Sequence, residues 1–184
     1  MSAISFFLVS VMPLKASATA ALNIVAKGKE WAEKNSTDQA TLLAETRLAP
    51  DMFPLSFQLQ MVADLIQTFV GHVRGVENAS VDGAKLTSFA AVEEAIKAAV
   101  AQLETLTPEE VDAAREKIIT LKLGPVITHK VTVGGLAGGF VLPNMQFHIT
   151  TAYSILRSKG VELGKGDYIG PFLGPAIAAA AGKN

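Results

Sequence analysis

Apolar residues recur every three or four positions over four long stretches of the chain, with charged residues between them. This spacing is typical of helices that bury one face and expose the other. Each stretch is bounded by glycine, proline or a polar run, which are the usual signals of helix ends. We therefore expect four principal helices, at about residues 14–35, 55–70, 87–106 and 143–160.

Two shorter helices are expected between the long ones. Ser36 is followed three residues later by Gln39, the spacing of a capping box, and predicts a helix that continues to about Glu45. Thr107 and Glu110 repeat this spacing before a second short helix, which should end before the next change of pattern.

The apolar period changes after the third long helix. Apolar residues alternate with Thr and Lys over residues 119–123 and again over 127–133, on either side of Gly124 and Pro125. Two alternating runs around a turn predict a β-hairpin. The glycine-rich run 134–139 is then expected to form a flexible joint before the fourth helix. The fold class that we expect is mainly all-α, an antiparallel four-helix bundle with a small β-hairpin between helices three and four.

Length and charge limit the classes of function. A chain of 184 residues suits one domain, 1–184, and its 16 Lys and Arg against 17 Asp and Glu leave no excess of positive charge. We therefore expect no nucleic-acid partner and no polybasic membrane surface. The absence of cysteine excludes disulfides, thiolate metal sites and a cysteine nucleophile.

Both ends of the chain are apolar. The run from Phe6 to Met12 resembles the apolar core of a secretory signal, but no positive charge precedes it, and Pro13 and Lys15 interrupt it. We expect a buried first helix and a cytoplasmic protein. At the other end, residues 171–184 form an alanine-rich tail, and the mean hydropathy of the whole chain is +0.34. An apolar tail needs a surface to cover it, so we expect a homodimer.

The fourth predicted helix carries the main candidate site. Asn144 and His148 lie one helical turn apart on an otherwise apolar face. Two polar side chains that face a core need a structural or functional reason, because burying them without partners is costly. A pocket where such groups gather is the expected place for chemistry.

Several segments resemble the signature blocks of domain-of-unknown-function family 1993. The blocks are RLAPDMFP at 47–54, PNMQFH at 143–148, AYSILR at 152–157, GVELGK at 160–165 and DYIG at 167–170. The likeness extends in looser form from about residue 10 to residue 170. The family is similar to the DinB-like four-helix bundles, many of them regarded as metal-dependent enzymes, often dimeric, that act on small molecules or thiols.

The resemblance implies positions for a metal site. DinB-like sites use one histidine of the second helix and two at positions i and i+4 of the last helix. His148 matches the second of that pair and Asn144 the first, and Gln58 is the polar residue nearest to the remaining position. Zinc and nickel favour imidazole, thiolate and carboxylate ligands, so one imidazole and two amides predict a lost metal site, with no metal and no cofactor. The other polar residues of that helix are assigned to its outer face: Gln60, Asp64 and Gln67.

The candidate residues each have a functional and a structural interpretation. His148 is either a general acid and base or a buried histidine bonded to backbone or to Gln58. Asp51 either adds a carboxylate to the pocket or caps the second long helix. Tyr153 should point to a neighbouring helix or a dimer partner, and Tyr168, in a predicted loop, either closes the pocket as a lid or packs against the bundle. The expected substrate-binding set is Asp51, Tyr153, Tyr168, Phe147 and Met61.

The preferred hypothesis is a bundle that binds a small apolar organic molecule. His148 would transfer a proton while Asn144 and Gln58 orient the ligand, as in a cofactor-independent isomerase or cyclase. The first alternative is a divergent DinB-like metal-dependent hydrolase or thiol transferase that uses His148 and Asp51. The second is a non-catalytic binding or scaffold protein, in which the three polar residues form only a buried hydrogen-bond network.

Overall fold

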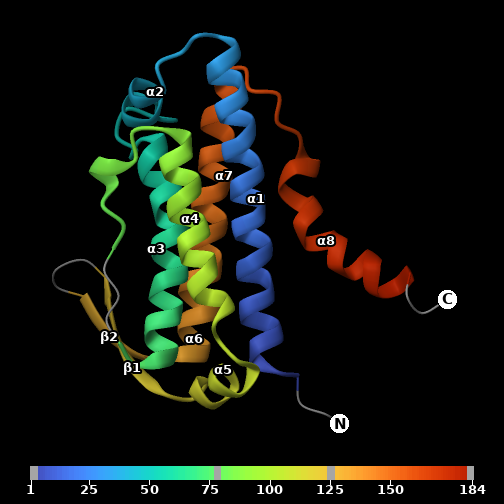
Figure 1. Ribbon diagram of the computed structural model, residues 1–184. Helices are drawn as coiled ribbons and strands as arrows, with labels where there is room; N and C mark the ends of the chain where they lie inside the picture. The colour runs from blue at the N-terminus through green and yellow to red at the C-terminus, as the bar shows by residue number, and fades with distance from the viewer. Residues whose placement is uncertain (1–3, 77–79, 124–126, 182–184) are drawn as a thin grey trace.

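The computed structural model describes residues 4–76, 80–123 and 127–181 (Figure 1). The chain is mainly helical with one small hairpin, as the sequence predicts. Four long helices lie side by side: α1 (Phe6–Lys34), α3 (Leu55–Arg74), α4 (Phe89–Glu104) and α7 (Leu142–Ser158). The remaining helical elements are α2 (Gln39–Glu45), η1 (Gly83–Lys85), α5 (Pro108–Ala114), α6 (Val133–Leu136), η2 (Ala137–Val141) and α8 (Lys165–Ala181).

The neighbouring helices α3 and α4 run in the same direction. Near their first residues, Gln39 of α2 accepts a hydrogen bond from the Phe89 backbone N–H at 3.0 Å. At their last residues, the Arg74 guanidinium donates to the hydroxyl of Thr105 at 2.9 Å. The described residues 80–88 run back along α3 from the level of Asp64 to the start of α4 (Figure 1). The bundle therefore has parallel as well as antiparallel neighbours, so the predicted antiparallel arrangement does not hold for α3 and α4.

The returning segment covers a side of α3 that the sequence assigns to solvent. Asp64 is only 9% exposed, because its carboxylate accepts hydrogen bonds from the Val81 backbone N–H at 2.7 Å and from Gln60 Nε2 at 3.1 Å. Gln60 also donates to the Val81 carbonyl at 3.0 Å. The prediction that Gln60 and Asp64 lie on the outer face is therefore wrong.

The other parallel pair is α1 and α7. Gln146 Nε2 of α7 donates to the Ser17 hydroxyl of α1 at 2.7 Å. Further along, a Cβ at Gly28 of α1 would lie 2.9 Å from the Phe89 ring and 3.1 Å from Leu156 of α7. Glycine at this position lets three helices approach closely. The core between the four helices is built from aliphatic side chains and phenylalanine, including Leu14, Ile24, Leu59, Leu65, Phe69, Ile96 and Leu103.

The hairpin closes one end of the bundle. Strands β1 (Ile118–Leu123) and β2 (Ile127–Thr132) pair antiparallel, with Ile119 opposite Val131. Ile119 is buried, which agrees with the alternation of apolar residues along this strand. The predicted turn at Gly124 and Pro125 lies outside the described residues.

The structure tests the two predicted capping boxes separately. At α5, the Thr107 hydroxyl accepts from the Glu110 N–H and the Glu110 carboxylate accepts from the Thr107 N–H, so this box is confirmed. At α2, Asp38 caps the helix by accepting from the Thr41 N–H at 2.8 Å. Ser36 instead adopts a left-handed conformation with φ of 51°, so the predicted Ser36 cap is wrong.

The glycine-rich run 134–139 is helical. The Thr132 hydroxyl accepts from the Gly135 N–H at 2.9 Å and caps α6, which continues through the wider π-helical segment η2 into α7. Pro143 has no backbone N–H to donate, so it interrupts the regular hydrogen-bond pattern of an α-helix. The wider π-helical turns of η2 end just before this residue. Leu136 and Val141 are buried and anchor the run to the core. The predicted flexible joint is therefore wrong.

The C-terminal segment is a helix, α8, that diverges from α1 after its first turns (Figure 1). Tyr168 lies in the first turn of α8 and is half-buried, so its predicted place in a loop is wrong. Among the described helices, α1 alone is long and apolar enough to cross a membrane, with a mean hydropathy of 1.5 over its best window. Half of that window is buried inside the bundle, as is common for a core helix.

Candidate functional site

His148 of α7 faces α3 and is linked to Gln58. Its Nδ1 lies 2.7 Å from Gln58 Oε1, and Gln58 Nε2 donates to the Phe53 carbonyl at 3.0 Å. Both side chains are buried: His148 is 8% exposed and Gln58 is 2% exposed. The sequence analysis left two hydrogen-bond partners open for a buried His148, the backbone or Gln58, and the structure shows Gln58.

These two hydrogen bonds define the proton position on His148. Because the Gln58 NH₂ group donates to a carbonyl, the oxygen of the same amide must face the imidazole. An amide oxygen only accepts, so Nδ1 carries the proton and Nε2 keeps a lone pair. In the described part of the chain, each fully covered side-chain nitrogen or oxygen has a partner. His148 Nε2 has none there, so we infer that Nε2 is open to solvent.

Aromatic rings surround the imidazole. The Phe57 ring lies 5.9 Å from the His148 ring at 70°, and the Phe147 ring lies 5.3 Å from it at 85°. Phe53 stacks on Phe57 at 4.2 Å and 26°. Phe53 is 63% exposed and Phe147 57% exposed, so a basic nitrogen lies within an exposed apolar surface. We call Phe53, Phe57 and Phe147 the phenylalanine cluster.

The sequence predicted Phe147 but not Phe53 or Phe57. Two phenylalanines four residues apart, on either side of the first residue of a helix, are the signal that would have indicated them.

Burial controls the ionisation of His148. Removing the ring from water disfavours the charged imidazolium and lowers the pKa of His148 to about 4. At neutral pH the ring is uncharged, and its Nε2 is a hydrogen-bond acceptor in almost every molecule.

Asn144 lies one turn before His148 on α7 and is half-buried. Its amide forms no side-chain hydrogen bond with the described residues. A carboxamide in this state can donate to a ligand oxygen without breaking an existing contact. Asn144 therefore lies on the same side of α7 as His148, which bonds to Gln58 of α3.

Asp51 lies apart from this group in an exposed turn before α3. Pro54 is the N-cap residue of α3, and no side chain caps this helix end. The capping role expected for Asp51 is therefore wrong, and its carboxylate is free of side-chain hydrogen bonds within the described chain.

Met61 lines a different hollow. A groove of about 720 Å³ runs between α3 and β1, and Met61, Leu65, Leu121 and Phe140 form part of its wall. The structure places Met61 on this groove, toward the hairpin end of the bundle.

The two tyrosines lie together on another side of α7. Tyr153 and Tyr168 line a cavity of about 260 Å³ between α7 and α8, with Thr150 and Lys165. Thr150 is two residues after His148, so its side chain points about 200° away around the helix. The predicted substrate-binding set is thus divided among four places, and only Phe147 lies beside the imidazole.

The donors near His148 do not fit a divalent metal. One imidazole and two carboxamides form the set, and the Gln58 oxygen already accepts from His148. The described residues contain no group of three or more His, Asp or Glu side chains that could hold a metal ion. Asp51 has no contact with His148 that would supply a carboxylate.

Comparison with known proteins identifies the family. The family model described as "Domain of unknown function (DUF1993)" matches residues 6–169. The crystal structure of a DinB family member protein from Shewanella denitrificans is similar to this chain, with a TM-score of 0.72 and 30% identity. The match covers 89% of this chain and 90% of that chain. No curated protein matches the sequence. The chain therefore belongs to the DUF1993 family, whose fold is DinB-like.

Proposed function

We propose that this protein binds a small apolar organic molecule against the phenylalanine cluster and that His148 moves a proton within it. The reaction class is a cofactor-independent isomerisation or cyclisation. The observation that carries the proposal is the fixed tautomer of His148, with Nδ1–H bonded to Gln58 and a free lone pair on Nε2. A general base needs such a positioned lone pair next to its substrate.

The exposed rings explain why the substrate should be apolar. Phe53 and Phe147 present more than half of their surface to solvent, so covering them with a ligand is favourable. His148 Nε2 lies beside these rings and accepts a hydrogen bond or a proton, so it favours ligands with a polar hydrogen or an acidic C–H bond.

The low pKa of His148 suits a proton that is borrowed and returned. The neutral ring takes a proton from a carbon next to a carbonyl, and the electron pair of that C–H bond moves to the carbonyl oxygen. The Asn144 amide can donate to this oxygen as negative charge develops. Because a buried imidazolium is a strong acid, it returns the proton to the far carbon of a C=C bond conjugated with the enolate, while the electron pair on oxygen re-forms the carbonyl and the C=C bond shifts by one position. The atoms and electrons balance without a second reactant.

A metal-dependent hydrolase or thiol transferase is the weaker alternative. It requires an anionic ligand beside His148, and the amide set described above does not supply one. Elemental analysis of protein purified without a metal-affinity tag tests this alternative directly. A stoichiometric divalent metal that is lost on His148→Ala would favour it over proton transfer.

The binding step can be tested with two matched probes. Indole has one N–H donor on an apolar ring, and 1-methylindole has the same ring without the donor. We expect indole to bind more tightly, by about two- to tenfold, the effect of one neutral hydrogen bond. The ¹⁵N signal of His148 Nε2 should shift with indole only. Equal affinities in the wild type, or a difference that persists in His148→Phe, would contradict the proposal.

The chemical step can be tested with 2-tetralone, an apolar aromatic ketone with acidic hydrogens. In D₂O, the wild-type protein should accelerate exchange of those hydrogens, and His148→Ala should lower the acceleration by about 100-fold or more. His129→Ala is the matched control, because His129 is exposed on β2. Probe binding without accelerated exchange would contradict catalysis and favour a binding protein.

We also propose a cytoplasmic location. What supports it is that α1, the apolar helix long enough to span a bilayer, packs within the bundle. Fractionation of cells that express the full chain tests this proposal, and recovery in a membrane fraction would contradict it.

A further inference from the structure

The cavity between α7 and α8 is separate from His148. It has a volume of about 260 Å³ and is lined by Thr150, Tyr153, Lys165 and Tyr168. Thr150 and Tyr153 belong to α7, and Lys165 and Tyr168 belong to α8, whereas His148 faces α3. The volume is below the roughly 300 Å³ at which pockets for drug-sized ligands begin, so the cavity suits a molecule of a single ring.

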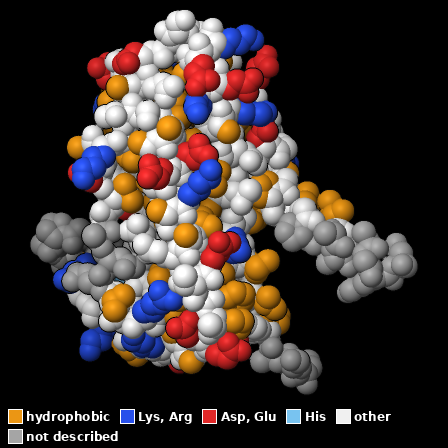
Figure 2. Space-filling view, viewed as in Figure 1, with side chains coloured by type: hydrophobic (Ala, Val, Ile, Leu, Met, Phe, Trp, Pro, Cys, Tyr) orange, Lys and Arg blue, Asp and Glu red, His pale blue; other side chains and the backbone are white. Residues whose placement is uncertain are grey.

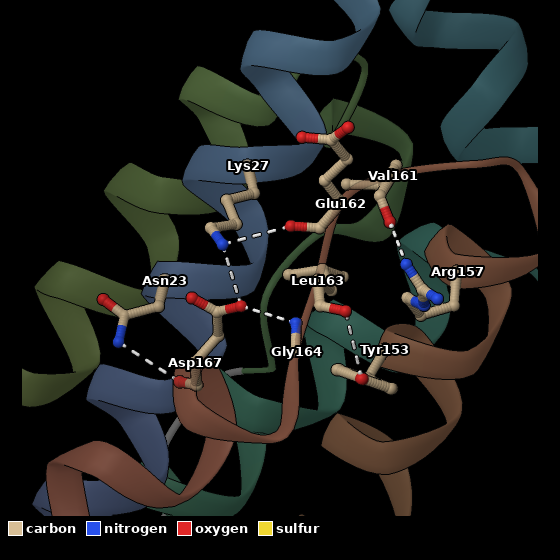
Figure 3. Close-up of polar contacts among 9 residues, drawn as sticks. All are labelled: Asn23, Lys27, Tyr153, Arg157, Val161, Glu162, Leu163, Gly164 and Asp167. Carbon is tan, nitrogen blue, oxygen red and sulfur yellow. Dashed lines mark hydrogen bonds and ion pairs between the residues drawn. The ribbon is translucent and has the colours of Figure 1, made fainter.

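Hydrogen bonds hold the two tyrosine rings in place. The Tyr153 hydroxyl donates to the Leu163 carbonyl at 3.3 Å (Figure 3). The Tyr168 hydroxyl donates to Gln146 Oε1, and Gln146 Nε2 in turn donates to the Ser17 hydroxyl at 2.7 Å. Because both hydroxyl groups already donate, the rings present mainly their carbon surfaces to the cavity. Rigid aromatic surfaces are well suited to bind another ring.

Lys165 gives this cavity a positive charge that no described residue neutralises. Lys165 is exposed and makes no ion pair or hydrogen bond with the described residues. The nearest acid along the chain, Asp167, is already bound by Lys27 Nζ at 2.8 Å and the Gly164 N–H at 2.7 Å (Figure 3). Lys165 is also the first residue of α8, where the helix dipole adds partial positive charge.

We propose that this cavity is a second binding site and that it takes a small aromatic carboxylate. The ring of the ligand packs against Tyr153 and Tyr168, and its carboxylate pairs with the Lys165 ammonium. The Thr150 hydroxyl, which makes no hydrogen bond with the described residues, is a further donor. Phe172 stacks on Tyr168 at 6.1 Å and supports that ring from within α8.

The composition of the chain makes a direct test simple. The sequence contains only two tyrosines, and both line this cavity. Protein with ¹³C-labelled tyrosine therefore reports on the site alone. We expect both ring signals to shift and saturate when sodium benzoate is added at constant ionic strength. Acetate, which has the charge without the ring, and benzyl alcohol, which has the ring without the charge, should each bind more weakly.

Variants then separate the charge from the fold. Lys165→Met keeps the aliphatic stem and should weaken benzoate binding by about fivefold, the effect of one exposed ion pair. Lys159→Met is the matched control, because Lys159 is exposed and does not line the cavity. The proposal is overturned if benzoate leaves both tyrosine signals unchanged. It is also overturned if acetate or benzyl alcohol binds as tightly as benzoate, or if Lys165→Met binds benzoate like the wild type.

The test is independent of the function proposed for His148. In Lys165→Met, the response of His148 Nε2 to indole should be unchanged, because the two sites lie on different sides of α7. A change in that response would contradict the separation of the two sites.

Discussion

The amide oxygen of Gln58 on α3 accepts a hydrogen bond from Nδ1 of His148 on α7, across 90 residues of sequence and at a distance of 2.7 Å. This bond joins two long helices, selects one tautomer of the imidazole, and leaves Nε2 available. The identity of one glutamine therefore determines which nitrogen of His148 can act as a base.

Removing the acceptor should destabilise the fold. Gln58→Leu keeps a similar volume but leaves the buried Nδ1–H without a partner, at an expected cost of about 1–3 kcal/mol in the free energy of unfolding. Urea denaturation at pH 7 measures this cost. Gln102→Leu, an exposed position on α4, is the control and should change stability little. A Gln58→Leu protein as stable as the wild type would mean that His148 finds another acceptor.

Stability should fall as the pH is lowered from about 6.5 to about 4. In this range an unfolded histidine, with its ordinary pKa near 6.5, gains a proton, whereas buried His148 stays neutral until its lowered pKa of about 4. The unfolded state then binds more protons, so the free energy of unfolding decreases. Part of the ring meets solvent, so we expect a loss of up to about 2 kcal/mol. His148→Phe should show a flatter pH dependence, and an identical slope would count against this assignment.

The first turn of α8 should depend on Asp167. Hydrogen bonding to the Gly164 N–H and then to Lys27 lowers the pKa of Asp167, so the carboxylate remains charged at neutral pH (Figure 3). In Asp167→Ala we expect the backbone amides of α8 to exchange about fivefold faster, corresponding to the loss of about 1 kcal/mol. Hydrogen–deuterium exchange with mass spectrometry measures this. Glu162→Ala is the control, since Lys27 contacts only the backbone carbonyl of Glu162.

We expect the protein to form a homodimer through α8. No charged residue follows Asp167 within this helix, and Leu173 and Ile177 are 50% and 66% exposed. Helices that are apolar all round are normally buried. The part of α8 after Asp167 is shorter than the roughly 20 residues that span a bilayer, and it carries no lysine or arginine for an anionic membrane surface.

A second copy offers a matching surface. Leu8 and Met12 on α1 are 56% and 41% exposed. Met12 lies eleven residues, or about three turns, before Asn23, whose side chain donates to the Asp167 carbonyl, so both face the side from which α8 departs. Figure 2 shows hydrophobic side chains over the lower part of the bundle and at the base of α8.

Light scattering should therefore give twice the subunit mass of 19.3 kDa. Leu173→Glu combined with Ile177→Glu should yield monomers, whereas Leu48→Glu, at a loop residue that is 51% exposed, should not. A wild-type protein that is monomeric at high concentration would refute the dimer.

Local patterns predicted the parts of the fold that local interactions control. The Thr107 capping box needs only residues three positions apart, and its sequence match corresponds to a real cap. At Ser36 the same spacing was misleading, because the helix begins two residues later and Asp38 caps it. The glycine-rich run has no conformational preference of its own, so burial of Leu136 and Val141 decided that it is helical.

The sequence by itself determined the mainly helical class and the sharing of one helix side by Asn144 and His148, because a period of 3.6 residues depends only on neighbouring positions. Only the tertiary structure decided that Gln58 bonds to His148, and that Tyr153 and Tyr168 line a separate cavity. These relationships depend on which helices are neighbours and on how each is rotated about its axis. Packing of the whole core sets both quantities, and no local spacing of residues encodes them.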